Sequence, residues 1–328
     1  MKAVVRHAYG SPDVFRLEEV AKPTAGETDV LVRVHAASAN AGDWHLMRGT
    51  PFPFRLVAGL LKPKHTIIGT DIAGRVEAVG RRVTQFKPGD DVFGELSRSG
   101  FGGYAEYVAA PETVLALKPS NASFEEAAAT PTSGLTALQG LRKGKIGPGQ
   151  KVLIHGAGGG VGTFAVQLAK SFGTEVTAVC GPGSVPVVRS IGADHVLDYT
   201  RDDFAQSGPR YDLILAVNGD RPIWDYRRAL SRNGAYIMSG GSNRQLLDSL
   251  LYGPLLSLGT QKFGNLLTRP SQLDLRFLKD LIERRKVKPV IDRRYALRDV
   301  PEAIRYVEAG HARGKVVVTI ETRNPATT

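Results

Sequence analysis

A glycine-rich loop between an apolar strand and a helix is the feature that most constrains this chain. Lys151–His155 predicts a buried strand, and Val161–Phe172 has apolar residues at helical spacing. A glycine turn at that junction lets backbone N–H groups approach a pyrophosphate, where the helix dipole adds partial positive charge. A plain glycine turn that packs a helix on a sheet is the alternative. The residues predicted to bind a dinucleotide are Gly156, Ala157, Gly158, Gly159, Gly160, Val161 and Gly162.

Strands and helices alternate from Ser123 onward. Ser123 and Glu126 form a capping-box pattern that starts a helix. Further strands are predicted at Glu175–Val179, Tyr211–Val217 and Ala235–Ser239, and a helix at 271–286. This alternation predicts an α/β fold with a doubly wound parallel sheet.

The region before Ser123 has a different character. Short β-branched or aromatic runs, bounded by Gly, Pro and Asp, predict strands there. A helical pattern is nearly absent, so we expect an all-β module with irregular loops. The strand Lys315–Ile320 is expected to return to this module and complete it. The predicted strands of the module itself are Lys2–Val5, Val30–Ala37, Ile72–Val79 and Tyr104–Ala109.

The end of the second strand of the α/β half bears on the choice of dinucleotide. Cys180 and Gly181 stand where NAD enzymes usually carry an acidic residue for the ribose hydroxyl. Without that acid a 2′-phosphate is not repelled, which favours NADPH. Ser184 and Tyr199 are candidates to bind the phosphate.

The composition of the chain limits the classes of protein to which it can belong. A chain of 328 residues fits about two domains, and its single cysteine excludes an internal disulfide. Lys2 and Arg6 interrupt the first apolar run, so we expect no signal peptide and a cytoplasmic location. The uncharged stretch Ser249–Gln261 is too short to span a membrane. The net charge of +11 suits anionic ligands, but no basic run reaches the length of a nucleic-acid patch.

Several motifs, in order along the whole chain, resemble the medium-chain dehydrogenase/reductase superfamily. Together with the glycine loop, they are similar to those of its zinc-free quinone oxidoreductase-like members. The motifs are Ala39–Asp43, Ile68–Val76, Lys87–Val92, Gly102–Tyr107, Ile191–Asp194 and Gly314–Val317.

The resemblance implies a GroES-like domain over residues 1–123 and 272–328 and a Rossmann domain over 124–271, with the active site in the cleft between them. It also implies NADPH-dependent reduction of quinones or of activated carbon–carbon double bonds, and a homodimer. The positions that match the family's catalytic zinc ligands are Asn40, Thr70 and Ala129. These are poor ligands in that combination, so we expect no metal.

Catalytic residues are expected near the nicotinamide. The family places the residues that match Asn40 and Asp43 there; capping of a turn is the alternative for both. His45 is a candidate proton donor, or else an exposed loop histidine.

Further cofactor contacts are expected at the nicotinamide end. The family suggests contacts from the hydroxyls of Thr132 and Thr136, which could equally bond back into their own helix. Other candidates follow strands or begin the returning C-terminal segment: Asn218, Gly240, Gly241, Gly314 and Lys315.

The stretch Leu246–Leu267 departs most from a regular Rossmann pattern. It is interpreted as lining for the acceptor pocket or as a dimer interface, with a peripheral membrane contact ranked behind both.

Three other functions stay open. The glycine loop equally suits a reductase of enoyl thioesters or alkenals. An RNA-associated protein ranks lower, because the basic residues form no clustered stripe. A protein that binds NADPH without turnover is the third.

Overall fold

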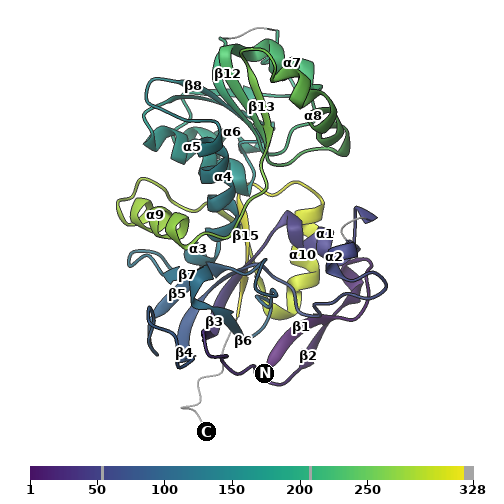
Figure 1. Ribbon diagram of the computed structural model, residues 1–328, viewed down its shortest axis with the longest axis vertical. Helices are drawn as coiled ribbons and strands as arrows, with labels where there is room; N and C mark the ends of the chain where they lie inside the picture. The colour runs from purple at the N-terminus through teal and green to yellow at the C-terminus, as the bar shows by residue number, and fades with distance from the viewer. Residues whose placement is uncertain (53–54, 207–208, 321–328) are drawn as a thin grey trace. The chain divides into compact units, whose positions relative to one another are not determined.

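The computed structural model describes residues 1–52, 55–206 and 209–320, and the chain divides into two units (Figure 1). The first unit comprises Met1–Thr132, Pro270–Glu283 and Pro289–Thr328, and the second comprises Ser133–Arg269 and Arg284–Lys288. The predicted boundary after residue 123 differs from this division because helix α3 (Phe124–Ala128) packs on strands β3 and β4 of the first unit. Residues 321–328 of the predicted domain lie outside the described residues.

The first unit is built on a seven-stranded sheet in the order β14-β15-β3-β4-β5-β7, with β6 also paired to β3. The prediction that the last strand returns to this module is confirmed, because β15 pairs antiparallel with β3. The strands of the sheet are β3 (Asp29–Ala39), β4 (Asp71–Val79), β5 (Asp91–Glu95), β6 (Tyr107–Pro111), β7 (Leu115–Leu117), β14 (Ile291–Ala296) and β15 (Lys315–Thr319). A separate antiparallel pair contains β1 (Lys2–Arg6) and β2 (Phe15–Glu19).

The expectation of an all-β module is wrong, because helices are built into this unit. The first, α1 (Ala41–Arg48), starts at a capping box in which Asn40 and Asp43 bond reciprocally. It ends at Gly49, whose φ of 64° is the left-handed conformation that glycine adopts without strain. The helix is short and weakly amphipathic, so its periodicity gave no signal in the sequence. The other helices of the unit are α2 (Arg55–Ala58), α9 (Gln272–Glu283) and α10 (Val300–Glu308), with 3₁₀ turns η1 (Pro12–Val14), η3 (Glu112–Val114) and η5 (Leu297–Asp299).

The core of the first unit joins segments from both ends of the chain. Val32 and Val34 of β3, Val316 of β15 and Ile304 of α10 belong to one buried cluster. The apolar residues of the C-terminal segment therefore complete a core that the N-terminal strands begin.

The second unit holds a six-stranded parallel sheet in the order β10-β9-β8-β11-β12-β13. Numbered from its first strand the order is 3-2-1-4-5-6, that of the Rossmann fold, so the predicted doubly wound sheet is confirmed. The strands are β8 (Lys151–His155), β9 (Glu175–Cys180), β10 (His195–Asp198), β11 (Tyr211–Ala216), β12 (Leu230–Met238) and β13 (Lys262–Asn265). The helices are α4 (Pro131–Lys143), α5 (Gly160–Ser171), α6 (Val185–Ser190), α7 (Ile223–Ala229) and α8 (Asn243–Leu256), with a 3₁₀ turn η4 (Pro182–Ser184).

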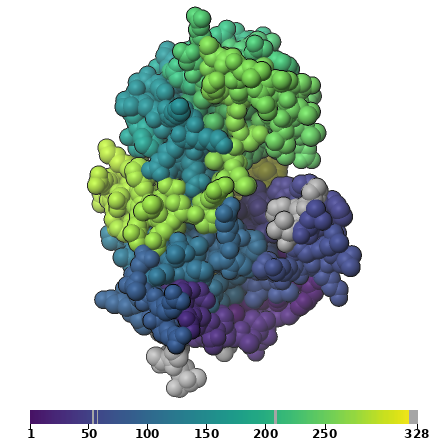
Figure 2. All heavy atoms as spheres, in the orientation of Figure 1, coloured from purple at the N-terminus to yellow at the C-terminus, as the bar shows by residue number. Residues whose placement is uncertain are grey.

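The stretch Leu246–Leu267 is more regular than the sequence suggested. It contains most of α8 and all of β13, which pairs with β12 as the last strand of the sheet. Pro254 and Gly253 inside α8 hid the helical pattern. Residues of α8 lie at the surface of this unit, green in Figure 2. Among the described residues, no helix is both long and apolar enough to cross a bilayer.

Candidate functional site

The loops predicted to bind a dinucleotide meet at one edge of the parallel sheet. Gly156 directly follows β8, Gly181 follows β9, and Tyr199 follows β10. Asn218 and Gly240 come just after β11 and β12. Because all these strands run in the same direction, their carboxyl ends share an edge, where open α/β sheets bind ligands.

Gly156 and Gly162 of the glycine loop are packed so closely that a side chain would not fit at either position. A Cβ atom on Gly156 would lie 2.8 Å from the backbone nitrogen of Asn218, and one on Gly162 would lie 2.6 Å from Cα of Ala157. Gly156 also has a φ of 89°. Helix α5 then begins at Gly160 after Gly159, which supplies no side-chain cap. The first N–H groups of α5 are therefore left for a ligand, as a pyrophosphate site requires.

A second group of predicted residues gathers beside this loop. A Cβ atom on Gly158 would lie 2.5 Å from Cβ of Ser184, and one on Gly181 would lie 3.1 Å from the hydroxyl oxygen of Tyr199. Tyr199 is 62% exposed. Cys180 is buried, and this burial raises the pKa of its thiol to about 11. The structure thus brings Gly158, Gly181, Ser184 and Tyr199 together, with a neutral thiol next to them.

An acidic residue that the sequence reasoning missed also lies here. Asp198 ends β10 and is the register partner of Cys180. Its carboxylate accepts hydrogen bonds from the backbone N–H (3.0 Å) and hydroxyl (2.8 Å) of Thr200, and these bonds lower its pKa. The available signal was an acid one strand beyond the strand end where NAD enzymes usually carry their acidic residue.

The loops after β11 and β12 are tied together on the other side of the glycine loop. Gly219 and Gly241 form an isolated parallel bridge. The amide of Gln245 lies against both, because a Cβ atom on Gly219 would meet Gln245 Nε2 at 2.8 Å and one on Gly241 would meet its Cδ at 3.0 Å. Gly240 packs against Val217, whose carbonyl oxygen would lie 2.6 Å from an added Cβ.

Gln245 belongs to a buried polar network under these loops. Its Nε2 atom donates to the hydroxyls of Tyr226 (3.1 Å) and Tyr236 (2.8 Å). The Tyr226 hydroxyl lies 2.7 Å from Nδ1 of His155, the last residue of β8. Burial lowers the pKa of His155 to about 4, so the imidazole is neutral at pH 7. The network fixes the carboxyl-end loops without adding a charge.

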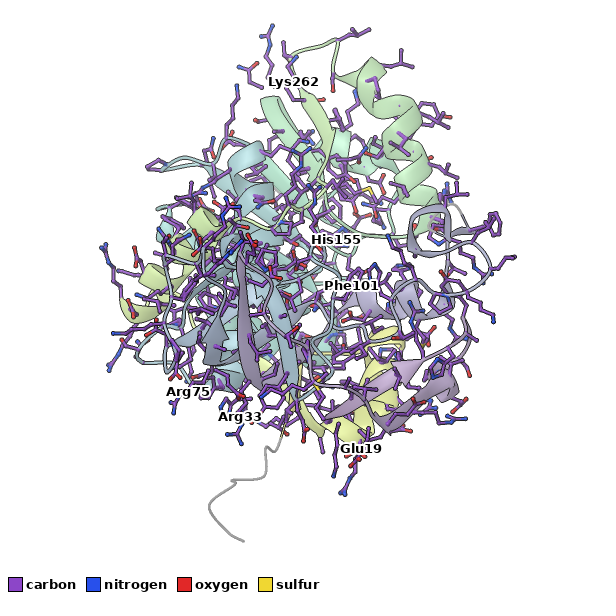
Figure 3. The ribbon with its side chains drawn as sticks, turned by 60° about the horizontal axis from the view of Figure 1, so that its bottom comes forward. Glu19, Arg33, Arg75, Phe101, His155 and Lys262 are labelled. Atoms are coloured by element: carbon purple, nitrogen blue, oxygen red, sulfur yellow. The ribbon has the colours of Figure 1, made fainter. Side chains whose placement is uncertain are left out.

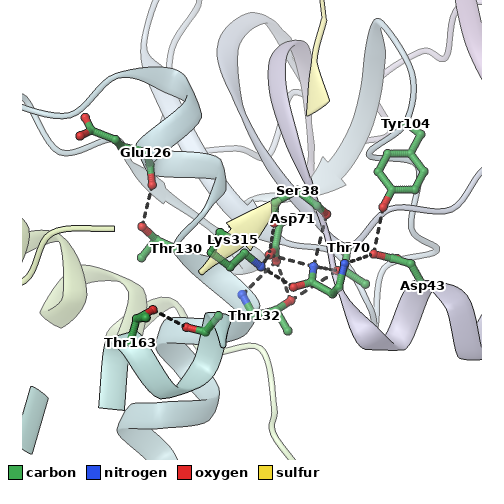
Figure 4. Close-up of polar contacts among 12 residues, drawn as sticks. Ser38, Asp43, Thr70, Asp71, Tyr104, Glu126, Thr130, Thr132, Thr163 and Lys315 are labelled. Carbon is green, nitrogen blue, oxygen red and sulfur yellow. Dashed lines mark hydrogen bonds and ion pairs between the residues drawn. The ribbon is translucent and has the colours of Figure 1, made fainter. Parts of the chain in front are cut away.

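A second candidate cluster lies inside the first unit (Figure 4). The register of β15 against β3 pairs Val316 with Ala39, and that of β3 against β4 pairs Ser38 with Asp71. The neighbouring Lys315 and Asn40 therefore come together with Asp71, although the lysine and aspartate are 244 positions apart. Gly314, with a φ of 123° and Val290 packed against it, lets the chain turn into β15.

Every polar group of the Asn40 side chain is engaged within this cluster. Its Oδ1 atom accepts from the ammonium group of Lys315. Its Nδ2 atom donates to Thr70 Oγ1 (3.0 Å) and Asp71 Oδ2 (3.0 Å), with a longer contact to the backbone oxygen of Ser38 (3.3 Å). The predicted catalytic asparagine thus holds the cluster together, as well as capping α1.

Asp71 is the centre of the cluster, and the sequence reasoning missed it. It is fully buried and accepts from the hydroxyl of Ser38 (2.8 Å) and from both the backbone N–H (2.9 Å) and hydroxyl (2.6 Å) of Thr132. Lys315 Nζ lies 3.4 Å from its Oδ2 atom. Thr132 therefore contacts Asp71 through both of its donors. The available signal was an acid inside the apolar run Ile67–Ala73.

Asp43 carries the most perturbed carboxyl of this cluster. It accepts from the backbone N–H of Asn40 (2.8 Å) and from the hydroxyl of Tyr104 (3.0 Å). Complete burial raises its pKa to about 7 despite these bonds. Glu95 has a pKa raised to about 7 as well, first by burial and then by the charge of Asp71. Near neutral pH, Asp43 and Glu95 are each partly protonated.

Two residues that the sequence suggested for the site, one as a proton donor and one as a cofactor contact, are not part of this cluster. His45 lies on α1 with its Nδ1 atom 2.9 Å from the backbone oxygen of Thr50, and its ring stacks on Trp44. Burial lowers its pKa. The hydroxyl of Thr136, in the second unit, lies 2.9 Å from that of Thr268.

Comparisons with known proteins match both halves of the chain. Residues 26–120 match the alcohol dehydrogenase GroES-like domain, and residues 191–318 match the zinc-binding dehydrogenase family. The chain is 36% identical to the chloroplastic quinone-oxidoreductase QR1 of Triphysaria versicolor, over 97% of this chain and 98% of that protein. The chain belongs to the quinone oxidoreductase-like group of medium-chain dehydrogenases/reductases.

Other relatives of this oxidoreductase carry different names. The 2-methylene-furan-3-one reductase of Solanum lycopersicum is 34% identical over 97% of this chain and 79% of that protein. The chloroplastic NADPH-dependent alkenal/one oxidoreductase of Arabidopsis thaliana is 32% identical with the same coverage. A solved quinone oxidoreductase from Coxiella burnetii superposes with a TM-score of 0.85 at 29% identity, covering 98% of this chain and 99% of that one.

The residues of this oxidoreductase at the zinc-ligand positions do not fit a zinc ion. Asn40 and Thr70 offer an amide and a hydroxyl, and Ala129 offers a methyl group. Zinc sites in proteins are instead built from thiolate, imidazole and carboxylate ligands. The ammonium group of Lys315, already bonded to Asn40, would also repel a metal cation.

The second unit of this oxidoreductase does fit a dinucleotide. Its tight glycine loop, the uncapped start of α5 and the shared carboxyl edge are what a bound pyrophosphate needs. The roles of the individual residues in binding stay predictions.

Proposed function

We propose that this oxidoreductase is an NADPH-dependent, metal-independent reductase that transfers a hydride to a quinone or an α,β-unsaturated carbonyl acceptor. The observation that carries the proposal is the glycine loop at the carboxyl edge of a Rossmann-ordered sheet, in which Gly156 and Gly162 leave no room for a side chain. The names of the relatives support the acceptor class.

The choice of NADPH rests on the group beside the glycine loop. Ser184 and Tyr199 are the proposed contacts of the 2′-phosphate, and no acid stands at the end of β9. The carboxylate of Asp198 on the neighbouring strand repels a phosphate group. Its carboxylate is occupied by Thr200, which reduces that effect.

The chemistry balances without a metal. NADPH supplies a hydride, which carries two electrons, and one proton from solvent completes the reduction. A quinone becomes a hydroquinone, or an enone becomes a saturated ketone, while NADPH becomes NADP⁺. A quinone or enone delocalises the incoming negative charge onto an oxygen atom, and hydrogen-bond donors can stabilise that oxygen. Oxidation of an alcohol would instead need a metal to stabilise the alkoxide.

We assign the cluster of the first unit a supporting role. Lys315 and Asp71 hold the Asn40 amide in one orientation, and Asp43 holds its backbone N–H. The partly protonated carboxyl of Asp43 keeps a proton on a buried oxygen near pH 7. A charged, hydrogen-bonded cluster of this kind is preorganised and needs no rearrangement during a reaction.

Initial rates of cofactor oxidation by chelator-treated protein test the proposal. NADPH and NADH are each paired with a naphthoquinone, an enone and an alkenal. We expect turnover with NADPH and the quinone or enone that zinc does not increase. NADPH binding without oxidation of any acceptor would contradict the catalytic proposal.

Ser184→Ala and Tyr199→Phe test the choice of cofactor. Loss of a hydrogen bond to the charged phosphate is expected to raise KM for NADPH about tenfold, with little change for NADH. Ser190→Ala is the matched control, because Ser190 is exposed and its hydroxyl donates to the backbone oxygen of Val187 within α6. Equal effects of Ser184→Ala on both cofactors would contradict the phosphate contact.

The alternative acceptor class is an alkenal or an enoyl thioester. Two relatives named as double-bond reductases favour it. Turnover with the alkenal alone would move the assignment to this class, while leaving the cofactor proposal intact.

We also propose a homodimer formed through α8 and β13. Strand β13 is the last strand of its sheet, and several leucines of α8 face outward, including Leu251 (63% exposed) and Leu255 (64%). Exposed apolar faces of this kind are typical of association surfaces. We therefore interpret the stretch Leu246–Leu267 as a dimer interface and not as the lining of the acceptor pocket.

A further inference from the structure

An exposed arginine stands in the turn that follows strand β10. Arg201 lies two residues beyond Tyr199, and its backbone N–H donates to the backbone oxygen of Asp198, the last residue of β10, at 2.9 Å. The side chain of Arg201 is exposed. Among the residues that the structure describes, no carboxylate forms an ion pair with its guanidinium group. The guanidinium group is therefore available to an anionic ligand.

This turn lies at the edge of the parallel sheet where the glycine loop also lies. In Figure 3, Lys262 marks the start of β13 and His155 marks the end of β8, so the two labels show the opposite edges of the sheet. Because β10 runs parallel to β9 and β8, Arg201 follows its carboxyl end at the same edge as His155. The backbone N–H of Tyr199 donates to the backbone oxygen of Cys180 at 3.2 Å, which ties the turn to the end of β9.

The contacts proposed above for the 2′-phosphate carry no positive charge. Ser184 and Tyr199 offer neutral hydroxyls, whereas the carboxylate of Asp198 beside them is negative. The pKa of Asp198 is lowered first by the hydrogen bonds from Thr200 and also by the charge of Arg201, so the arginine lies close enough to act on this carboxylate. A phosphate at this place needs a cation, because hydrogen bonds between charged groups are much stronger than those from neutral hydroxyls.

Two other arginines of the second unit are less well placed to supply this charge. Arg221, which follows β11, is held by Asp203 at 2.9 Å and by Asp225 at 2.8 Å. Arg189 lies in the last turn of α6, and that helix leads back to the start of β10, away from the carboxyl edge. Arg201 combines a place at the edge with a guanidinium group that is not engaged by a described carboxylate.

We propose that Arg201 distinguishes NADPH from NADH by binding the 2′-phosphate with its guanidinium group. The assignment rests on the NADPH-dependent function proposed above and adds a charged contact to the hydroxyls of Ser184 and Tyr199. The planar fork of an arginine donates two N–H groups to the oxygens of one phosphate. NADH carries a neutral hydroxyl at this position, so it gains little from the positive charge.

Binding of nucleotide fragments tests the assignment without turnover. Adenosine 2′,5′-bisphosphate carries the 2′-phosphate and adenosine 5′-monophosphate lacks it, and isothermal titration calorimetry gives the Kd of each. Arg201→Gln is expected to weaken binding of the bisphosphate about tenfold and to leave that of the monophosphate nearly unchanged. The preference of the wild type should also fall as salt is added, because the charge of an exposed arginine is screened. An undiminished preference for the bisphosphate in Arg201→Gln would overturn the assignment.

Further variants separate this role from a general effect of charge. Arg201→Lys keeps the charge without the planar fork and should recover part of the preference for the bisphosphate. Lys151→Gln removes one exposed charge at the opposite edge of the sheet, at the start of β8, and should change neither affinity. An equal loss of bisphosphate binding in Arg189→Gln would point to a general effect of charge and contradict the assignment. All these side chains are exposed, so the variants are expected to fold as the wild type does.

Rates of cofactor oxidation separate this assignment from the proposed reaction. In an active enzyme, Arg201→Gln should raise KM for NADPH about tenfold, with kcat and the KM for NADH unchanged. If Arg201→Gln loses bisphosphate binding but the wild type oxidises no NADPH, the arginine contact stands and the reductase proposal fails. Equal affinity of the wild type for the two fragments would contradict both the choice of NADPH and the role of Arg201.

Discussion

The ammonium group of Lys315 lies 3.4 Å from the carboxylate of Asp71, and both side chains are buried inside the first unit. A buried ion pair adds little stability compared with apolar packing, but removal of one partner leaves an uncompensated charge. The pair also orients Asn40, because the lysine bonds to the amide oxygen and the aspartate to the amide nitrogen. Its main contribution is therefore to fix the arrangement of the cluster.

Lys315→Met is expected to destabilise the protein by about 3 kcal/mol, because Asp71 stays buried without its cation. The double variant Lys315→Met/Asp71→Asn should recover part of the loss, since the remaining amide carries no charge. Denaturant unfolding measures both, with exposed Lys87→Met as the control. A double variant less stable than Lys315→Met would show that the charge of Asp71 is not the cause.

Asp43 makes stability depend on pH between about 4 and 7. Its folded pKa of about 7 exceeds the unfolded value near 3.9, so the folded state holds the extra proton and stability falls as pH rises through 7. The expected loss from this group between pH 6.5 and 8 is on the order of 1 kcal/mol, and stability changes little at higher pH. Asp43→Asn should remove this contribution to the pH dependence of the free energy of unfolding, whereas Asp280→Asn, at an exposed position, should not. Parallel pH dependence in wild type and Asp43→Asn would contradict the raised pKa.

Gly158→Ala places a methyl group against Ser184, and the expected destabilisation is about 1–3 kcal/mol. The same change should weaken NADPH binding, because the loop must shift. Ser184→Gly in the same chain creates room and should restore stability. Thermal unfolding and cofactor titration are the measurements. If Ser184→Gly restores nothing, the two residues do not pack as described.

Gln245→Leu removes the donor shared by the hydroxyls of Tyr226 and Tyr236. Loss of buried hydrogen bonds costs about 1–3 kcal/mol, and the loops held by the Gly219–Gly241 bridge should loosen. We expect lower stability and weaker NADPH binding. Gln206→Leu, at an exposed glutamine, is the control. An effect on stability alone would limit Gln245 to a packing role.

Leu251→Glu on α8 tests the proposed dimer. A carboxylate on an apolar association surface is expected to shift the protein from dimer to monomer in analytical ultracentrifugation. Leu273→Glu, at an exposed leucine of α9, should leave the dimer intact. A monomeric wild type would contradict the dimer itself.

Local signals were strong enough to predict much of the second unit. The strand Lys151–His155, the glycine loop and the start of α5 follow one another within a few residues, so their pattern is legible without tertiary contacts. Helix α1 was missed because it is short, and α8 because Pro254 and Gly253 interrupt its apolar pattern.

The sequence alone determined the fold class, the glycine loop and the order of the main strands, since each depends on residues close together in the chain. Tertiary structure decided which polar side chains meet. Strand register brings Lys315 to Asn40 and Asp71, and it also pairs Asp198 with Cys180. Register is set by how distant strands pair and bury one face, and a one-residue slip would separate every one of these partners.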